Sequence, residues 1–514
     1  MRSRRKTTVA VALTAAAATA LTAGSALAAT STGPSTTTAP YVLPVAAGVD
    51  TTSLLTVGDK VGEDGYRMVG IPDGLGAFDQ GANRVVFMNH ELRADAGVVR
   101  RHGEKGAFVS RLVLDPETGR VKSASDLINP GVQYWDYQTG QYAAAPVAPT
   151  GAAAGTHAAA FSRFCSGALT DPGQLLNGKT GYRGQIYFAN EETGDEGRAF
   201  GVTKGGDTYQ LPRLGLFSWE NTLAAANNSN TTLVMGNEDG ANGQLRAYVG
   251  TKQVNGSPVD KAGLTNGMLN VISVPDFADP ADLPPVAGSN TPVIPSPTSA
   301  QFGKGNSRPF VLSRVDYTKN GVAQNVEADA KGMRFNRIED GHFDPNSPND
   351  YYFLTTEGGG KTADPLDPPN TTRDGGGLWR LSYKDIDKPE LGGTLTLLLD
   401  GTEAPLLNKP DNMAIDAAGH LLIQEDPGNN KHIARILSYD ISDTSLTTLA
   451  QFDPALFSGS SPITIDEESS GIIEVSPGLF LFDAQVHAKL ADPELVEMGQ
   501  LLTMTVDWTK VDRS

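Results

Sequence analysis

Cys165 is the only cysteine in the 514-residue chain, and it stands at the start of a strand-like segment, "FCSGALTD". Four other strand-like segments carry acids at or just before the same place, namely Glu220, Glu339, Asp411 (followed by Asn412) and Glu468. Carboxylates suit hard cations such as Ca²⁺, whereas a thiolate suits softer ions such as iron. Cys165 is therefore a candidate metal ligand; the alternatives are a small buried hydrophobe and, less favoured, a nucleophile, since no histidine is obviously placed to activate it.

A second set of acids ends six runs of about four apolar or aromatic residues. The runs are "RVVFMNHE" (84–91), "QIYFANEE" (185–192), "TLVMGNED" (232–239), "YYFLTTE" (351–357), "LLIQED" (421–426) and "LFLFD" (479–483). Their terminal acids are Glu91, Glu191 with Glu192, Glu238 with Asp239, Glu357, Glu425 with Asp426, and Asp483. A single acid of this kind is most often a solvated turn residue. Acids that recur at the same place in six runs indicate a shared site.

The segments that carry these acids are predicted to be strands. A continuous apolar run bounded by turns is typical of a strand buried on both faces. Further strand-like segments precede and follow most runs, which predicts an all-β, six-bladed β-propeller with long inter-strand insertions. A pair of packed sheets is the alternative. In an antiparallel pair, the start of one strand and the end of the next share a sheet edge, so both sets of acids should converge near a central channel.

So many carboxylates in one place repel one another unless cations neutralise them. An oxygen-rich cluster suits Ca²⁺, Mn²⁺ or Fe³⁺. His90, His342 and His487 lie near these strand ends and could be further ligands or acid–base groups. For all three, the favoured interpretation is a histidine that only hydrogen-bonds neighbouring carboxylates.

Composition and the terminal segments indicate where the protein is located and which partners are excluded. Residues 1–28 predict a signal peptide with a paired Arg4-Arg5, which allows twin-arginine export, and residues 29–42 predict a disordered leader. Removing residues 1–28, with four basic residues and no acid, takes the net charge from −18 to −22, which argues against nucleic-acid binding. We expect a secreted monomer without a transmembrane segment, folded as one domain over 43–512 with a Pro-rich insertion around 275–306.

The order of the motifs resembles the PhoX-type alkaline phosphatases from about residue 65 to 490. The motifs are "NHE", "CSG", "EET", "GLFSWEN", "GNEDG", "RIED", "PDNMAID", "DEESSG" and "FLFDAQVH". The resemblance implies an exported six-bladed propeller with an iron pair and several calcium ions. The chain departs from the family at "GLFSWE", where Leu216 and Trp219 replace an arginine and a histidine.

The resemblance also implies roles for particular residues. Cys165 would ligate iron, and Glu91, Glu191, Glu192, Glu238 or Asp239, Glu339 and Asp411 would bind metal. Arg337 and Asn89 would contact phosphate, and Asn412 belongs to the same site. Glu220 and Glu468 join the predicted metal ligands through their strand positions.

The leading hypothesis is a secreted metal-dependent alkaline phosphatase that hydrolyses small organic phosphomonoesters. Two alternatives stay open: a calcium-dependent phytase-like or lactonase-like propeller hydrolase, and a non-catalytic calcium-stabilised propeller that binds a partner. Neither alternative gives Cys165 a role.

Overall fold

The computed structural model describes residues 29–275, 277, 302–356, 376–428 and 432–512. The predicted signal peptide and most of the predicted Pro-rich insertion lie outside the described residues. Within the described chain, no helix has the length and apolar character needed to cross a membrane.

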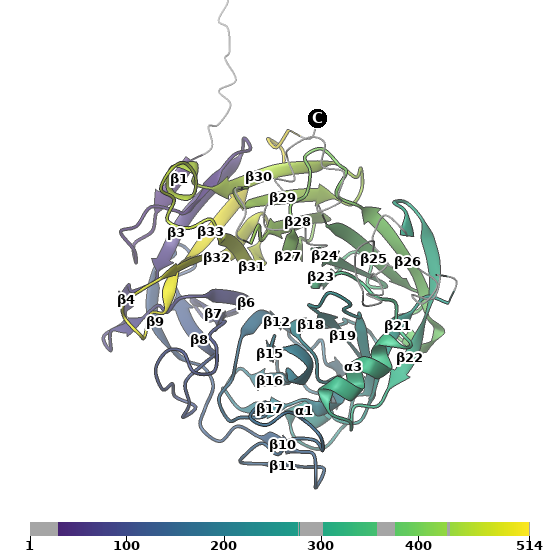
Figure 1. Ribbon diagram of the computed structural model, residues 1–514. Coiled ribbons are helices and arrows are strands. Elements are labelled where there is room, and N and C mark those ends of the chain that lie inside the picture. Colours follow the sequence, from purple (N-terminus) through teal and green to yellow (C-terminus); the bar gives the residue numbers. More distant parts are fainter. Residues whose placement is uncertain (1–28, 276, 278–301, 357–375, 429–431, 513–514) are drawn as a thin grey trace, which may run out of the picture.

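The described residues form five sheets of four or more strands, arranged radially around a common centre (Figure 1). Two sheets have four strands, in the order β6 (Pro72–Gln80), β7 (Asn83–His90), β8 (Phe108–Leu114), β9 (Val121–Asp126), and β12 (Phe164–Leu169), β15 (Ile186–Glu191), β16 (Ala199–Thr203), β17 (Thr208–Gln210). The third sheet has nine strands, in the order β18 (Trp219–Ala224), β19 (Thr231–Glu238), β20 (Arg246–Thr251), β21 (Met268–Ser273), β22 (Ser307–Val315), β26 (Gly393–Leu399), β25 (Gly377–Tyr383), β24 (Asp350–Thr355), β23 (Ile338–Phe343).

The last two sheets combine both ends of the chain. One contains β27 (Pro410–Ile415), β28 (His420–Glu425), β29 (Arg435–Asp440), β30 (Leu446–Phe452) and β2 (Val42–Pro44). The other contains β31 (Glu467–Ser476), β32 (Leu479–Lys489), β33 (Glu497–Val506), β3 (Val49–Thr56) and β1 (Ala29–Thr32). Short ribbons and helices decorate the periphery: β4 (Lys60–Val61) with β5 (Tyr66–Arg67), β10 (Tyr134–Asp136) with β11 (Gln141–Ala143), β13 (Leu176–Asn177) with β14 (Thr180–Gly181), α1 (Pro258–Lys261), α3 (Gly321–Asp329) and α4 (Pro454–Phe457).

Six strands line the centre, and each contacts the next around a closed circle: β6, β12, β18, β23, β27 and β31. The six predicted apolar runs lie on the strands that pair with them, and those strands are almost wholly buried. Apolar clusters fill the spaces between sheets; one joins Phe87 of β7, Phe164 of β12 and Phe200 of β16. The predicted all-β, propeller-like arrangement is confirmed.

The predicted disordered leader is not what the structure shows. Thr-rich β1 pairs in parallel with β3, and β2 pairs antiparallel with β30. Tyr41 is buried and packs edge-on against Phe457. Because β-branched residues favour strands and Tyr41 supplies an apolar anchor, this segment is held against the fold.

Candidate metal centre

A repeated backbone feature positions the side chains at the end of the channel. In five of the inner strands the pairing register shifts within the first few residues, between Pro72 and Leu75 in β6 and at equivalent places in β12, β18, β23 and β27. A β-bulge of this kind inserts an extra residue and re-aims the neighbouring side chains. The shifts fall on Asp73-Gly74, Cys165-Ser166, Glu220-Asn221, Glu339-Asp340 and Asp411-Asn412.

A backbone hydrogen bond then ties the two strands of each unit together. The N–H of a residue close to the end of the second strand (the exit position) donates to the carbonyl of the residue that precedes the first strand (the entry position). The six pairs are Glu91 to Ile71, Glu192 to Arg163, Asp239 to Ser218, Thr356 to Arg337, Asp426 to Lys409 and His487 to Asp466, at 2.9–3.2 Å. Two residues after each entry position comes the start position: Asp73, Cys165, Glu220, Glu339, Asp411 and Glu468.

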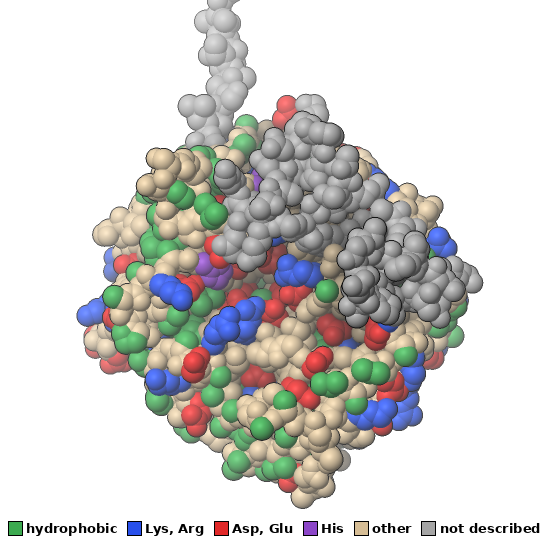
Figure 2. Space-filling view, in the orientation of Figure 1, with side chains coloured by type: hydrophobic (Ala, Val, Ile, Leu, Met, Phe, Trp, Pro, Cys, Tyr) green, Lys and Arg blue, Asp and Glu red, His purple; other side chains and the backbone are tan. Residues whose placement is uncertain are grey.

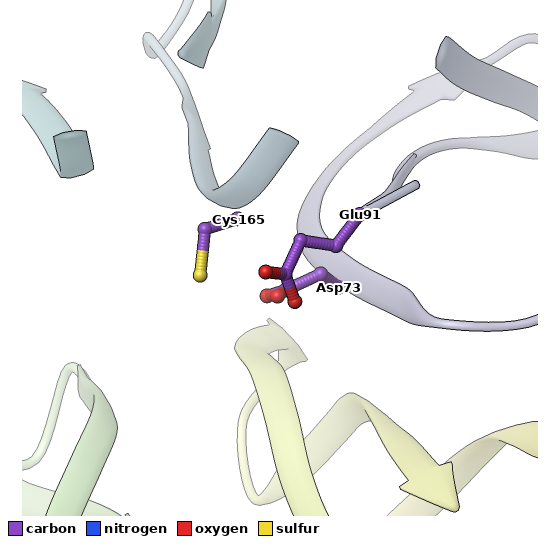
Figure 3. Close-up of side chains that lie close together, drawn as sticks. All are labelled: Asp73, Glu91 and Cys165. Carbon is purple, nitrogen blue, oxygen red and sulfur yellow. The ribbon is translucent and has the colours of Figure 1, made fainter. Parts of the chain in front are cut away.

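We call the start and exit residues together the mouth ring. Four overlapping groups within it each bring three ligand atoms within 4.8 Å of one another: Asp73, Glu91 and Cys165; Cys165, Glu192 and Glu220; Glu220, Glu339 and Asp411; Asp411, Asp426 and Glu468. Figure 3 shows the Cys165 thiol and the carboxylates of Asp73 and Glu91 turned toward one shared space. Asp and Glu side chains gather at the centre of this face, with Lys and Arg beside them (Figure 2). The arrangement can hold metal ions.

The electrostatics of the ring favour added positive charge. Burial, reinforced by neighbouring carboxylates, raises the pKa values of Glu192, Glu220, Asp411 and Glu468 well above their ordinary range. The same causes raise the pKa of Asp73 to about 7. A bound cation would reverse this effect, because it stabilises the charged form of each ligand.

The Cys165 thiol is exposed to the same electrostatic environment as these carboxylates. Burial first, and then the charges of Asp73 and Glu220, raise the pKa of Cys165 well above its ordinary value. Its Sγ lies 3.2 Å from Oε2 of Glu220. A nearby cation is therefore needed for Cys165 to be a thiolate at neutral pH.

Three predicted ligands lie outside the four groups, and two of them, Glu191 and Glu238, are turned toward buried arginines. Nε and Nη2 of Arg198 donate to the two oxygens of Glu191 at 2.6 Å. Nη2 of Arg246 donates to Glu238 at 2.8 Å. Side chains alternate along a strand, so Glu191 and Glu238 point away from the ring that the next residues, Glu192 and Asp239, enter.

Asp239 occupies an exit position but is paired with the predicted phosphate-binding arginine. Nε and Nη2 of Arg337 donate to its two oxygens at 2.8 and 2.9 Å. Nη2 of Arg337 also lies 3.1 Å from Oε1 of Glu339, and the Arg337 side chain is 35% exposed. Arg337 thus stands at the edge of the ring with one part open to solvent.

The two predicted asparagines lie beneath the ring. Nδ2 of Asn89 donates to the carbonyl of Cys165 at 2.7 Å, and the Asn89 side chain is fully buried. Nδ2 of Asn412 donates to Oγ of Ser166 at 2.6 Å, joining two inner strands on opposite sides of the channel. Their amides hold the bulges in place, which does not favour a direct phosphate contact for Asn89.

The structure adds ring members that we did not predict as ligands: Asp73, Asp426 and His487. The similarity of Pro72-Asp73-Gly74 to Pro410-Asp411-Asn412 is a signal that could have found Asp73. Burial opposes the charged form of His487, but hydrogen bonds to Glu468 and Glu497 outweigh it and raise its pKa to about 12. Glu357 lies outside the described residues, and Asp483 lies four residues below the exit position.

A layer of polar side chains separates the ring from the other end of the channel. Asn412 and Ser166 belong to it, as does Gln485, whose Nε2 donates to Asp73 at 2.9 Å. Beyond this layer a cavity of about 540 Å³ opens between the inner strands, lined mainly by small and apolar residues. His342 lines this cavity and therefore does not join the ring.

Fold and site together define a propeller-like protein with a thiol-containing acidic ring at one end of its channel. Residues 202–451 match the family described as Alkaline phosphatase PhoX. Over these residues the chain is thus similar to the PhoX alkaline phosphatases, and the resemblance predicted from the sequence is confirmed.

Solved structures support the fold. Pseudomonas fluorescens PhoX, in complex with vanadate as a transition state analogue, aligns with a TM-score of 0.61 at 13% identity, covering 91% of this chain and 97% of that one. Luciferin-regenerating enzyme (TM-score 0.32, 10% identity, 85% and 92% covered) and an α-L-arabinofuranosidase of Coprinopsis cinerea (0.32, 9%, 88% and 96%) are too distant to carry an argument. No curated protein sequence matches the chain.

Proposed function

We propose that this protein is a secreted, metal-dependent alkaline phosphatase that hydrolyses phosphomonoesters at the mouth ring of a six-bladed propeller. The observation that carries the proposal is the chain of four ligand groups linked through Cys165, Glu220 and Asp411. The family match over residues 202–451 supports the reaction class. The six inner strands, each beginning one unit of the ring, support the blade count.

The donor set fits two kinds of metal. Cys165 belongs to the two groups that also contain Asp73, Glu91, Glu192 and Glu220, and a thiolate among carboxylates suits iron. The groups built on Glu339, Asp411, Asp426 and Glu468 offer only oxygen, which suits Ca²⁺. When bound, such ions would stabilise the negative charge that develops on the phosphoryl oxygens.

The chain's own residues orient the substrate. Arg337 presents a planar guanidinium that can donate two parallel hydrogen bonds to a phosphate oxygen pair. Its contacts with Asp239 and Glu339 fix it at the edge of the ring, and its partial exposure leaves it accessible. The buried amides of Asn89 and Asn412 hold the bulges of neighbouring strands, so they set the spacing of the ligands.

The first experiment combines metal analysis with turnover. Wild-type protein should contain iron and calcium and should hydrolyse 4-nitrophenyl phosphate at alkaline pH, and a chelator should abolish the activity. Cys165→Ser should lose iron and at least about 100-fold of kcat/KM, since a ligand of the reacting centre is removed. Glu117→Gln, on an exposed turn, is the matched control and should keep both.

Two outcomes would contradict the proposal. Fully metallated wild-type protein without turnover would favour a calcium-stabilised binding propeller. Turnover with calcium alone, indifferent to Cys165→Ser, would favour a phytase-like or lactonase-like hydrolase.

A further inference from the structure

Four of the six entry positions share an unusual backbone conformation. Ile71, Arg163, Arg337 and Lys409 have φ values of 49°, 49°, 59° and 50°. Non-glycine residues seldom adopt this left-handed region, and they persist there when the surrounding structure requires it. In these four units the chain therefore turns in the same way just before the inner strand, and it delivers an entry side chain to equivalent places around the ring.

Arg163, like Arg337, contacts the exit acid of the preceding unit and one acid of its own unit. Nη2 of Arg163 lies 2.7 Å from Glu91, the exit acid of the preceding unit, as Arg337 pairs with Asp239, the exit acid of its own preceding unit. Arg163 also bonds an acid of its own unit, Glu192, through Nε and Nη2. The two arginine side chains are 36% and 35% exposed.

Both arginines keep donors for a further partner. Their hydrogen bonds to residues of the described chain run through Nε and Nη2, and none uses Nη1. A guanidinium carries five N–H donors in one plane, so a carboxylate on one edge does not prevent an anion from binding another edge. Each therefore stands ready to bind an anion that enters the mouth.

The two arginines serve different parts of the ring. Arg163 holds Glu91 and Glu192, whereas Arg337 holds Asp239 and Glu339, and they share no carboxylate. Ligand groups centred on Glu220 stand between them. One phosphate bound beside Arg337 would leave Arg163 facing another part of the same substrate.

We infer that Arg163 is a second anion-binding arginine, and that the site prefers phosphomonoesters whose organic part carries another anionic group. The identity of the first anion rests on the proposed phosphatase function. Arg163 would bind the second anion, a carboxylate or a further phosphate, and would thereby determine specificity rather than take part in bond cleavage.

The test uses two ligands that cannot be hydrolysed, phenylphosphonate and 4-carboxyphenylphosphonate, titrated calorimetrically into metal-loaded protein. Wild-type protein should bind the carboxylated ligand more tightly. Arg163→Gln should lower the ratio of the two affinities about tenfold, a difference of one lost charge-assisted contact. Arg163→Lys should restore part of the ratio, and Arg337→Gln should weaken both ligands. Arg120→Gln, an exposed arginine in the turn between β8 and β9, removes the same charge and should change neither.

Two results would overturn the inference. One is an unchanged affinity ratio in Arg163→Gln, whether or not both ligands bind more weakly. The other is a loss of bound metal in that variant, which would make Arg163 a counter-charge for the metal ligands. Because binding is measured without turnover, the outcome is separate from the proposed reaction. If the wild-type protein hydrolyses aryl phosphates but its affinity ratio for the two ligands does not depend on Arg163, the proposed function stands and the inference about Arg163 is wrong. If the affinity ratio depends on Arg163 but no aryl phosphate is hydrolysed, the inference about Arg163 stands and the proposed function is wrong.

Discussion

Glu191 and Glu192 are neighbours in the chain with opposite electrostatic environments. Glu191 is buried against Arg198, whereas Glu192 enters the ring beside other carboxylates and is bound by the partly exposed Arg163. Glu191→Gln should cost about 3–5 kcal/mol of unfolding free energy, because it leaves the buried Arg198 without its partner. Glu192→Gln should cost the metal-free protein much less, because burial and Glu91 oppose the charge of Glu192, and Arg163 keeps Glu91 as a partner and is partly open to solvent.

Urea denaturation of both variants in chelator measures the difference. The substitutions remove the same charge at adjacent positions, so each is the control for the other. Equal destabilisation would show that the two environments do not differ as described.

This pair also shows what the sequence could and could not indicate. The motif "NEE" places two acids at a strand end, but which of them faces the channel depends on the strand's register, which a single sequence does not define. A partial signal exists in the following strand. An arginine stands seven, eight and ten residues after Glu191, Glu238 and Glu425, and in each case it binds that acid.

Among the strands, the apolar runs were sufficient to predict buried elements, and the antiparallel rule was sufficient to bring strand starts and ends together. The bulges were not predictable, because they arise from pairing between strands rather than from local composition. Asp73 is absent from the predicted ligands for this reason. The predicted end of the last run was also misplaced, since β32 continues past Asp483 to Lys489.

Because β32 is longer than predicted, Asp483 lies inside the strand and not at its end. Four residues before the exit position, the other five units have buried Phe87, Phe188, Met235, Tyr352 and Leu422. Asp483 is fully buried there, and neither carboxylate oxygen has a hydrogen-bond partner in the described chain. Burial, with the charge of Asp73 in addition, raises its pKa well above the ordinary range.

We predict that Asp483→Leu stabilises the protein at neutral pH by about 1–3 kcal/mol, because it removes the desolvation cost of an unpartnered polar group. Asp483→Asn should stabilise less, since its amide would still lack partners. Equilibrium unfolding at pH 7 and at pH 5 checks the cause, because the advantage over wild type should shrink at the lower pH. A destabilised Asp483→Leu protein would show that the carboxylate has a ligand.

Closure of the whole molecule depends on pairing between the two ends of the chain. β3 adds to β33, with Val49 opposite Val506, and β2 adds to β30. These contacts join residues more than 400 positions apart, so no local pattern in residues 29–44 distinguishes them from a solvated leader. The closed circle in turn holds the six units at fixed spacing, which is why acids from distant segments share one site (Figure 1).

The same closure concentrates charge, and we predict that metal-free protein loses stability as pH rises. Burial raises the pKa of Asp73 to about 7 and that of Glu339 to about 8, above their ordinary values near 4. The folded state therefore binds protons more tightly than the unfolded chain between about pH 4 and pH 8. The stabilising contribution is complete below that window and is lost as pH rises through it.

Bound ions replace these protons, so the metal-loaded protein should lack most of this dependence. Scanning calorimetry at pH 5 and pH 8, with and without chelator, should show a Tm lower by more than about 5 °C at pH 8 only when metal is absent. Titrating groups elsewhere affect both forms alike, so the difference between them reports the ring. Asp73→Asn and Glu339→Gln should each reduce the metal-free slope. Parallel Tm curves for the two forms would mean that the ring's carboxylates are not held against their mutual repulsion by the closed fold.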